Sequence, residues 1–384
     1  MAPPAHPQHL DHRTEVLTMA LLGFEGFDAY GDVTQLGQQL SLTTTGGAYA
    51  AIKTTTPRTG RACMTFRMVV NGPGGTVRQS FTLSGTTVIV GVAVRWLTFP
   101  LGTVRPRVRL WSSGTSRSGM AFGVNSSGNL YVGLGGPTTV TGLGTDVSTT
   151  LWTNTGEIEP LNSWIYYELK VSLTSTTAGS WSLRRNGQVV QAQSGVATLV
   201  NAADAISAVI VEIGIAGSTL PYIDQHFDID DLYVCDGSGS ALNDFLGSVR
   251  VRSLKPTANN SVAMTPNTGT NWAAVADATP DDDTTVVSAA SASLTDTYAI
   301  EDLPASAAIV RALRAIYRVR KEDASAVETT PVLISSGVTA TGNLDAPDTT
   351  YRYFVSLFPI DPATGVAWTP AAVNSLLAGV RRVA

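Results

Sequence analysis

Cysteine, histidine and charged residues are all scarce in this sequence. Its 384 residues include two cysteines, four histidines and 14% Asp, Glu, Lys and Arg. A secreted disulfide scaffold would contain more cysteine, so we expect Cys63 and Cys235 to be buried free thiols. A disulfide between them is the alternative, because they lie near the two ends of the first predicted domain.

Long hydrophobic runs and strongly basic regions are also missing. The longest apolar runs, such as Val88 to Val94, have the length of a strand, so no membrane span is predicted. Residues 1–13 have no apolar core, and we expect no secretory signal peptide. The net charge of −5 is spread along the chain without a basic cluster, which argues against nucleic acid as a partner.

Turn-forming and β-branched residues are plentiful instead, and this composition is typical of an all-β protein. Apolar and polar residues alternate over Trp164 to Val171, Ser180 to Arg185 and Phe227 to Val234, the pattern of strands with one buried face. Asn186-Gly187 follows the second of these runs and favours a two-residue hairpin turn. Val104 to Trp111 also alternates, and we expect it to be half-exposed, with Pro106 at an edge or a bulge.

The length of the chain suits two domains. We expect a flexible N-terminal arm (1–15), a first β-sandwich (16–236), a linker (237–243) and a second, smaller β-sandwich (244–384). In the second domain, 245–254 is predicted to form a strand. For 305–321 strand is preferred, with helix as the alternative. Thr369 and Pro370 favour the start of a short helix over 368–377.

The strand runs of the first domain, opened by Leu21 to Phe27, resemble a concanavalin A-like (laminin G-like) jelly-roll β-sandwich. The second half resembles a module found behind lectin-like domains in virion proteins of tailed bacteriophages. The residues that carry this likeness are Asp244 to Gly247, Trp272 to Asp283, Asp361-Pro362, Trp368-Thr369, Val373-Asn374 and Gly379-Val380.

The resemblance implies a structural component of a phage virion: a tail fibre, neck or head decoration protein located on the particle. It implies contacts with other virion structural proteins, a homo-oligomer, and attachment to a glycan of the host surface through the lectin-like domain. A soluble lectin and a polysaccharide-degrading enzyme are the alternatives, and fold alone does not decide among them.

The residues do not form a recognisable catalytic set. Glycosidases of this fold use paired carboxylates on one strand, but Glu157-Ile158-Glu159 lacks a third acid and is followed by Pro160. The only histidine after residue 12 is His226, and no Gly-x-Ser-x-Gly motif is present. We therefore predict that the chain is not an enzyme.

Two groups of carboxylates are candidate cation sites. Asp228, Asp230 and Asp231, with Asp224 nearby, could bind calcium at the rim of the sandwich. The alternative is that Asp228 and Asp230 point outward from the last strand of the first domain. Asp281-Asp282-Asp283 could also bind a cation. The alternative for this group is a loop stabilised by bonds from its side chains to the backbone. The histidines His6, His9 and His12 are expected to belong to a polar tail.

Tryptophan is the remaining indication of a ligand. A sugar ring can stack on an exposed aromatic side chain beside amide groups. Trp152 and Asn154, in a segment predicted to be a loop, are therefore the candidate glycan-binding residues, with a structural or interface role for Trp152 as the alternative. Trp164 and Trp181 lie in strand patterns and are expected in the core.

Overall fold

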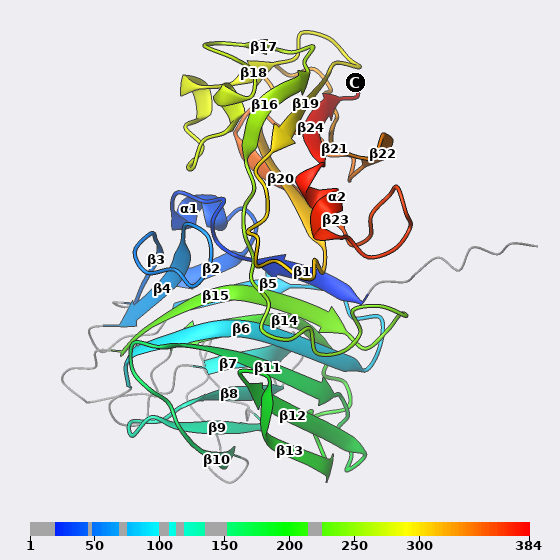
Figure 1. The fold of residues 1–384 in the computed structure, drawn as a ribbon. Coiled ribbons are helices and arrows are strands. Elements are labelled where there is room, and N and C mark those ends of the chain that lie inside the picture. Colours follow the sequence, from blue (N-terminus) through cyan, green and yellow to red (C-terminus); the bar gives the residue numbers. More distant parts are fainter. Residues whose placement is uncertain are drawn as a thin grey trace, which may run out of the picture.

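The computed structural model describes residues 20–44, 48–68, 75–99, 107–112, 119–134, 152–213 and 225–384. Figure 1 shows two β-rich parts joined by a crossing connection. Helix is limited in these residues to α1 (Val33–Leu36), α2 (Pro370–Asn374) and two short 3-10 turns, η2 (Ala273–Val275) and η3 (Asp282–Thr284). The predicted all-β class is confirmed. The predicted arm, with its three histidines, lies outside the described residues.

The first domain is a sandwich of two antiparallel sheets. Sheet I has the order β13 (Gln188–Val196), β12 (Gly179–Arg185), β11 (Trp164–Ser172), β6 (Thr87–Thr98), β15 (Gln225–Asp236), β4 (Cys63–Met68) and β3 (Ala48–Lys53), and β1 (Leu21–Glu25) also pairs with β15. Sheet II has the order β10 (Trp152–Ile158), β9 (Asn129–Leu134), β8 (Met120–Val124), β7 (Arg107–Ser112), β14 (Ile206–Ile213), β5 (Gly75–Ser80) and β2 (Ser41–Thr44).

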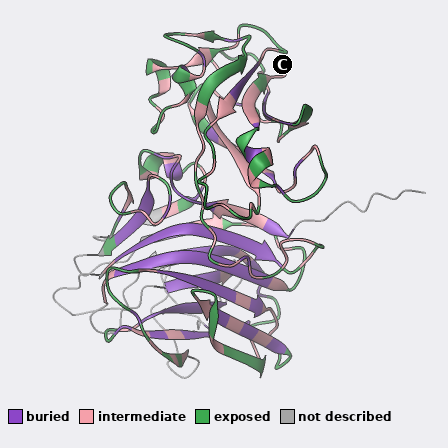
Figure 2. Cartoon of the chain, viewed as in Figure 1, coloured by how far each residue is buried: buried purple, intermediate pink, exposed green. Residues whose placement is uncertain are grey.

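The core of this domain lies between the two sheets because alternate residues of each strand are apolar. On β6, Val88, Val90, Val92 and Val94 are fully buried and face this core. Figure 2 shows β6 and β15 buried along most of their length, whereas β13 at the edge is exposed. Trp181 belongs to this core, as predicted, while Trp164 packs on the other face of sheet I.

The predicted hairpin turn is present, and a second hairpin turn joins β8 to β9. Asn186 and Gly187 have φ values of 49° and 83°, the left-handed pair that closes a two-residue turn between β12 and β13. Between β8 and β9, the side-chain oxygen of Asn125 accepts hydrogen bonds from the backbone N–H groups of Ser127 and Asn129. These local interactions fix the strand registers from short stretches of sequence.

The connection between the domains (237–255) lies across the outer face of sheet I and forms no regular strand there, so the prediction of a strand over 245–254 is wrong. Its apolar residues pack on the sheet instead of pairing with a neighbour. A second hydrophobic cluster joins Leu21, Ile89, Ala93, Tyr166, Tyr233 and Cys235 of the first domain to Leu242, Phe245, Leu246 and Val249 of the connection and to Ala312 and Leu357 of the second domain.

A buried polar group holds this connection in place. The Tyr233 hydroxyl donates to Glu168 Oε1 at 2.6 Å and accepts from the Leu246 backbone N–H at 3.1 Å. The Gly247 N–H donates to the same Glu168 oxygen at 2.8 Å. Because Glu168 is fully buried, these hydrogen bonds compensate part of its desolvation.

Gly91 makes room for the Tyr233 ring. A Cβ atom at this position would lie 2.0 Å from the ring, so the Gly91→Ala variant must displace Tyr233 and its hydrogen bonds. We expect a loss of about 1–3 kcal/mol in the free energy of unfolding, measured by chemical denaturation. Gly85→Ala is the control, because its nearest neighbouring atom would be 3.9 Å away. A Gly91→Ala variant as stable as the parent would contradict this packing.

The second domain is built around sheet III, with the order β16 (Pro256–Ser261), β19 (Thr295–Ile300), β24 (Leu377–Arg382), β21 (Thr329–Ser335) and β22 (Val338–Thr341). Two further pairs complete it: β20 (Leu313–Val319) with β23 (Arg352–Phe358), and β17 (Thr265–Pro266) with β18 (Val287–Ser288). Within 305–321 the regular element is the strand β20, as preferred, although it begins only at Leu313. Thr369 caps α2 and Pro370 is its first residue, as predicted.

Cys63 and Cys235 are buried free thiols, as predicted, and burial is the main cause that raises the pKa of Cys63 to about 12. No helix in the described ranges is both long and apolar enough to cross a membrane.

Candidate ligand-binding face of sheet II

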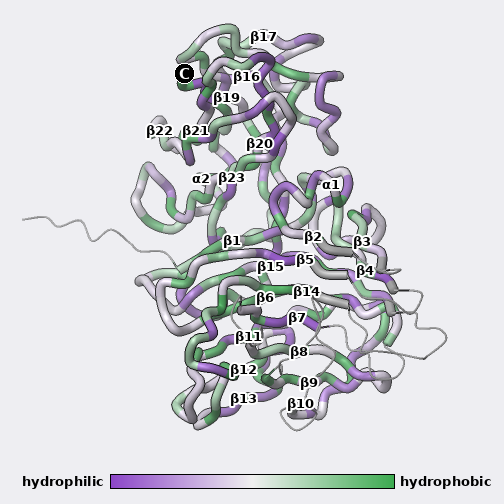
Figure 3. Tube along the Cα trace, turned by 180° about the vertical axis from the view of Figure 1, so that it is seen from behind, coloured by the Kyte–Doolittle hydropathy of each residue, from purple (hydrophilic) through white to green (hydrophobic). Residues whose placement is uncertain are grey.

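The outward-facing side of sheet II is rich in arginine. On β7, Val108 and Leu110 point into the core, so the residues that alternate with them, Arg107, Arg109 and Trp111, lie on the outer face. The side chains of Arg107 and Arg109 are nevertheless buried, with 7% and 6% exposure. Each takes part in a polar, charged or ring interaction. Figure 3 shows hydrophilic residues on β7, whereas the neighbouring β14 is mostly hydrophobic.

Strand register aligns these residues with others in two rows across the sheet. The first row contains Asn154, Tyr131, Gly123, Arg107, Glu212, Thr76 and Thr43. The second contains Trp152, Gly133, Ala121, Arg109, Ile210, Arg78 and Ser41. The rows therefore hold three arginines and one glutamate. The even spread of charge inferred from the sequence does not extend to this face.

Arg78 is stacked on an aromatic ring. Its guanidinium carbon lies 3.8 Å from the centre of the Trp111 ring, reaching across β14. Arg78 Nε is buried and has no hydrogen-bond partner, and burial lowers the pKa of Arg78 from its usual value. Both side chains are partly exposed. A cation held over a ring is already oriented for an anion that reaches its exposed part.

The structure changes the interpretation of the predicted glycan-binding residues. Trp152 and Asn154 belong to β10 and not to a loop, so the loop prediction is wrong. Backbone pairing places Trp152 opposite Gly133 and Asn154 opposite Tyr131, at the end of the two arginine rows. Asn154 is exposed, and its side-chain oxygen accepts from the Gly156 N–H at 2.9 Å. A direct role of either residue in binding stays a prediction.

The connection and the second domain cover part of the outer face of sheet I, over β1, β6, β11 and β15, as the second hydrophobic cluster shows. Trp164 takes part in this covered surface: its indole N–H donates to the Thr56 carbonyl at 3.3 Å, and the Arg95 guanidinium lies 5.3 Å from its ring. The centre of the outer face of sheet II is buried as well, at Arg109, Ala121 and Ile210.

The aspartates predicted as calcium ligands bind other groups of the protein. Asp228 is fully buried and accepts from Arg95 Nε at 3.1 Å and from Lys53 Nζ at 3.0 Å. A bulge follows in β15, where Asp231 has a φ of 52°. Because of it, Asp230 and Asp231 both turn toward the loop around Arg58.

Asp230 and Asp231 together hold that loop and the connection. Asp230 Oδ2 accepts from the backbone N–H groups of Arg58 and Thr59, and Asp231 accepts from the Arg58 guanidinium and from the Val251 N–H. Among the residues that the structure describes, no group of three or more His, Cys, Asp or Glu side chains is arranged to hold a metal ion. These contacts favour an internal role for the aspartates over calcium binding.

The close carboxylates predict a pH-dependent stability. Burial, and then the Asp231 carboxylate, raises the pKa of Asp230 to about 9. At a pH between the unfolded and the folded pKa of Asp230, the folded chain keeps a proton on this carboxyl that the unfolded chain has lost. This contribution to stability is complete below the unfolded pKa and is lost as the pH rises through the raised, folded one, between about pH 4 and pH 9. In Asp230→Asn we expect a weaker decline in unfolding free energy over this range.

The measurement is chemical denaturation at a series of pH values. Asp302→Asn, which removes an exposed carboxylate, is the matched control and should keep the decline of the parent. Parallel pH profiles for Asp230→Asn and the parent would show that Asp230 does not hold the extra proton.

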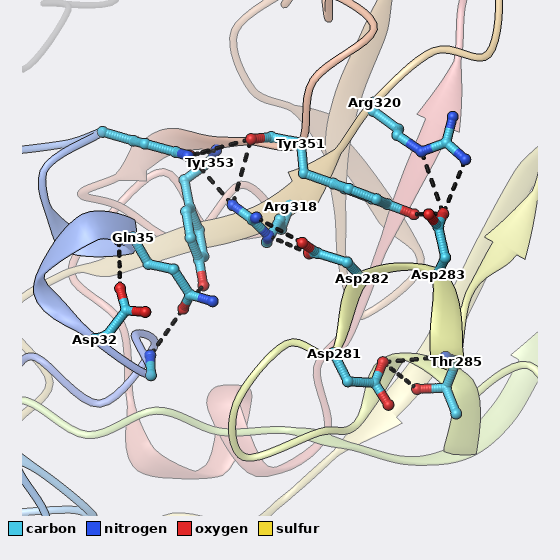
Figure 4. A network of polar contacts seen from close by, with 12 residues as sticks. Asp32, Gln35, Asp281, Asp282, Asp283, Thr285, Arg318, Arg320, Tyr351 and Tyr353 are labelled. Atoms are coloured by element: carbon cyan, nitrogen blue, oxygen red, sulfur yellow. Dashed lines mark hydrogen bonds and ion pairs between the residues drawn. The ribbon is translucent and has the colours of Figure 1, made fainter.

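The remaining acidic candidates are also engaged. Glu159 is buried, and both of its carboxylate oxygens lie 3.1 Å from Arg185 Nε. Figure 4 shows that Asp282 and Asp283 point toward arginines of β20 and its end, whereas Asp281 accepts from Thr285. Arg318 binds both oxygens of Asp282, and Arg320 binds Asp283 at 2.8 Å. The predicted alternative, a loop held by side-chain-to-backbone bonds, describes Asp281, whose carboxylate accepts from the Thr285 N–H. Asp282 and Asp283 pair instead with arginines outside their loop.

Sequence comparison finds no match to any protein-family model and none among curated proteins. Structural comparison finds an endo-β-1,4-glucuronan lyase from the fungus Trichoderma reesei (12% identity, TM-score 0.41, covering 57% of this chain and 95% of the lyase). A PL-14 alginate lyase from Aplysia kurodai is similar to the same degree (12%, 0.40, 56% and 98%). A carbohydrate esterase from the Shiga toxin-encoding bacteriophage phi24B has 11% identity and a TM-score of 0.37, covering 55% and 98%.

These similarities concern the fold. Their TM-scores lie below 0.5 and they cover little more than half of this chain, so the β-sandwich is described from its own two sheets. The prediction that the chain is not an enzyme is corrected by them, because solved structures of similar fold include lyases and an esterase. The missing glycosidase motif excludes one set of catalytic residues and not catalysis as such.

Proposed function

We propose that the first domain binds an acidic polysaccharide on the outer face of sheet II. The observation that carries this proposal is the pair Arg78 and Trp111, stacked 3.8 Å apart beside Arg107 and Arg109. An aromatic ring offers a platform for a sugar, and a guanidinium offers paired N–H donors to a carboxylate or a sulfate.

The spacing of the arginines suits a polymer better than one small anion. Arg109 and Arg78 share a row and are separated by β14, so their strands lie about 10 Å apart, since neighbouring strands are about 4.8 Å apart. Arg107 and Arg109 are two residues apart on one strand, or about 7 Å. Cations repeated at such intervals match charges repeated along a chain.

The test measures affinity of the full chain for alginate, polygalacturonate and neutral dextran by isothermal titration calorimetry at increasing salt. We expect binding to the two uronic-acid polymers, weakening with salt as charges are screened, and none to dextran. Equal affinity for all three, or no binding, would overturn the proposal. Polymer length is followed in the same samples by size-exclusion chromatography, and shortening would identify the site as catalytic as well as binding.

We further propose, from the sequence resemblance, that the chain works on a phage particle. It would there form a homo-oligomer with contacts to other virion structural proteins, and the saccharide would belong to the host surface. Immunogold electron microscopy of particles with antibody to this chain tests this proposal. Label on intact particles is expected; label only in the unassembled fraction of the lysate would overturn it.

A further inference from the structure

We propose that the second domain braces the edge of the saccharide-binding face through Tyr353, which acts as a positioning residue. This inference rests on the proposed function of sheet II. It concerns the segment 26–40 of the first domain, which runs from the end of β1 through α1 to the start of β2. That segment contacts the second domain on one side, and on the other its residues Phe27, Tyr30, Leu36 and Leu40 pack into the core of the sandwich.

The second domain holds this segment by its backbone and its amide side chains. The Tyr353 hydroxyl lies 3.0 Å from the Ala29 carbonyl oxygen and 2.9 Å from Gln35 Oε1. Gln35 Oε1 also accepts from the Gly31 N–H, so Tyr353 and Gln35 together fix this turn. The rings of Tyr353 and Tyr30 meet edge to face with centres 5.1 Å apart.

Two neighbouring glutamines extend the contact toward β2. Gln39 Nε2 donates to the Tyr353 carbonyl at 2.6 Å, and Gln38 Nε2 donates to the Tyr351 carbonyl at 3.2 Å. The Tyr353 N–H and Arg318 Nη1 both donate to Gln38 Oε1, at 3.1 and 3.2 Å. Figure 4 shows Tyr353, Arg318 and Tyr351 of the second domain gathered beside Gln35.

The braced segment leads directly into the binding face. Ser41, two residues after Gln39, begins β2, and it pairs with Arg78 of β5. In its sheet, β2 pairs only with β5, so its position depends on that pairing and on the segment that precedes it. A shift of the segment would therefore move the strand pair that carries Arg78 relative to Arg107 and Arg109. Binding of a polymer that spans these arginines requires their spacing to be preserved.

The test compares Tyr353→Phe with Tyr317→Phe. Tyr317 lies in the same two-stranded ribbon, but its hydroxyl contacts Thr329 and Asp345 within the second domain. Hydrogen exchange of both full-length variants is measured without saccharide. We expect Tyr353→Phe to speed exchange severalfold in residues 33–44 and 75–80, and Tyr317→Phe to leave these segments unchanged. Unchanged exchange there in Tyr353→Phe, or faster exchange throughout the first domain, would overturn the proposal.

Affinity for uronic-acid oligosaccharides of increasing length gives the second readout. Tyr353→Phe should weaken binding severalfold only for oligosaccharides long enough to reach Arg78, and a general loss of stability would weaken binding of all lengths equally. Equal weakening at all lengths would therefore also overturn the brace. If the parent chain binds no saccharide, the proposed function fails, and the exchange data still decide whether Tyr353 positions β2 and β5.

Discussion

Replacing Arg78 by glutamine is expected to weaken binding of a uronic-acid polymer by roughly tenfold to a hundredfold. Hydrogen bonds to charged groups contribute about 1.5–3 kcal/mol, and each 1.4 kcal/mol is about a factor of ten in affinity. Arg78 has a free buried Nε and a guanidinium held on Trp111, so the cation is already oriented before the ligand arrives. Glutamine keeps a polar side chain but removes the charge and the planar fork of donors.

The measurement is titration calorimetry with polygalacturonate at low salt. Arg352→Gln serves as the matched control, because Arg352 is an exposed arginine of the second domain that pairs with Asp348. It makes the same change in net charge outside sheet II, and its affinity should equal that of the parent. Equal affinities for Arg78→Gln and Arg352→Gln would show that net charge, and not this face, governs binding.

Replacing Arg314 by methionine is expected to lower the free energy of unfolding by about 3–5 kcal/mol, the usual cost of removing one partner from a buried ion pair. Arg314 Nη2 lies 2.9 Å from Glu25 Oε2, and the Glu25 side chain is 2% exposed. Glu25 also accepts from the Gly26 and Phe27 N–H groups and from the Tyr30 hydroxyl. In the Arg314→Met variant, the buried Glu25 carboxylate would still accept from these neutral donors but would have lost its cationic partner.

Chemical denaturation of the full chain measures this loss. Arg352→Met makes the same substitution in an exposed pair, where the expected cost is at most about 1 kcal/mol. In a double-mutant cycle, Glu25→Gln should reduce the cost of Arg314→Met, because the unpaired charge is then absent. A cost for Arg314→Met no larger than for Arg352→Met would contradict the role of this ion pair between the domains.

Local patterns in the sequence were sufficient for much of the fold. Alternation in Trp164 to Val171 and the Asn186-Gly187 turn each depend on neighbouring residues, and the strand and the turn are confirmed. The same holds for the helix start at Thr369 and Pro370. The expectation of one buried face is wrong, because Tyr166 and Glu168 on the second face are buried too. The strand prediction for 245–254 is wrong because the apolar residues of this segment, Phe245 and Leu246 among them, pack on a sheet that is distant in the sequence.

The sequence predicts only part of the proposed binding face on sheet II. The alternation of Arg107 and Arg109 with Val108 and Leu110 predicts a half-exposed strand. The structure shows a strand between β8 and β14 whose two arginines are buried. The approach of Arg78 to Trp111 across β14 depends on strand order, which no local pattern encodes. The run from Arg107 to Trp111 contains no acidic residue, and this absence could have indicated the basic face.

A crystal structure of the full chain with a uronic-acid oligosaccharide tests the central claim most directly. The account predicts a sugar ring at Trp111 and a carboxylate within hydrogen-bonding distance of Arg78 on the outer face of sheet II. An oligosaccharide bound on the second domain, or at the junction between the domains, with the outer face of sheet II empty, would contradict it.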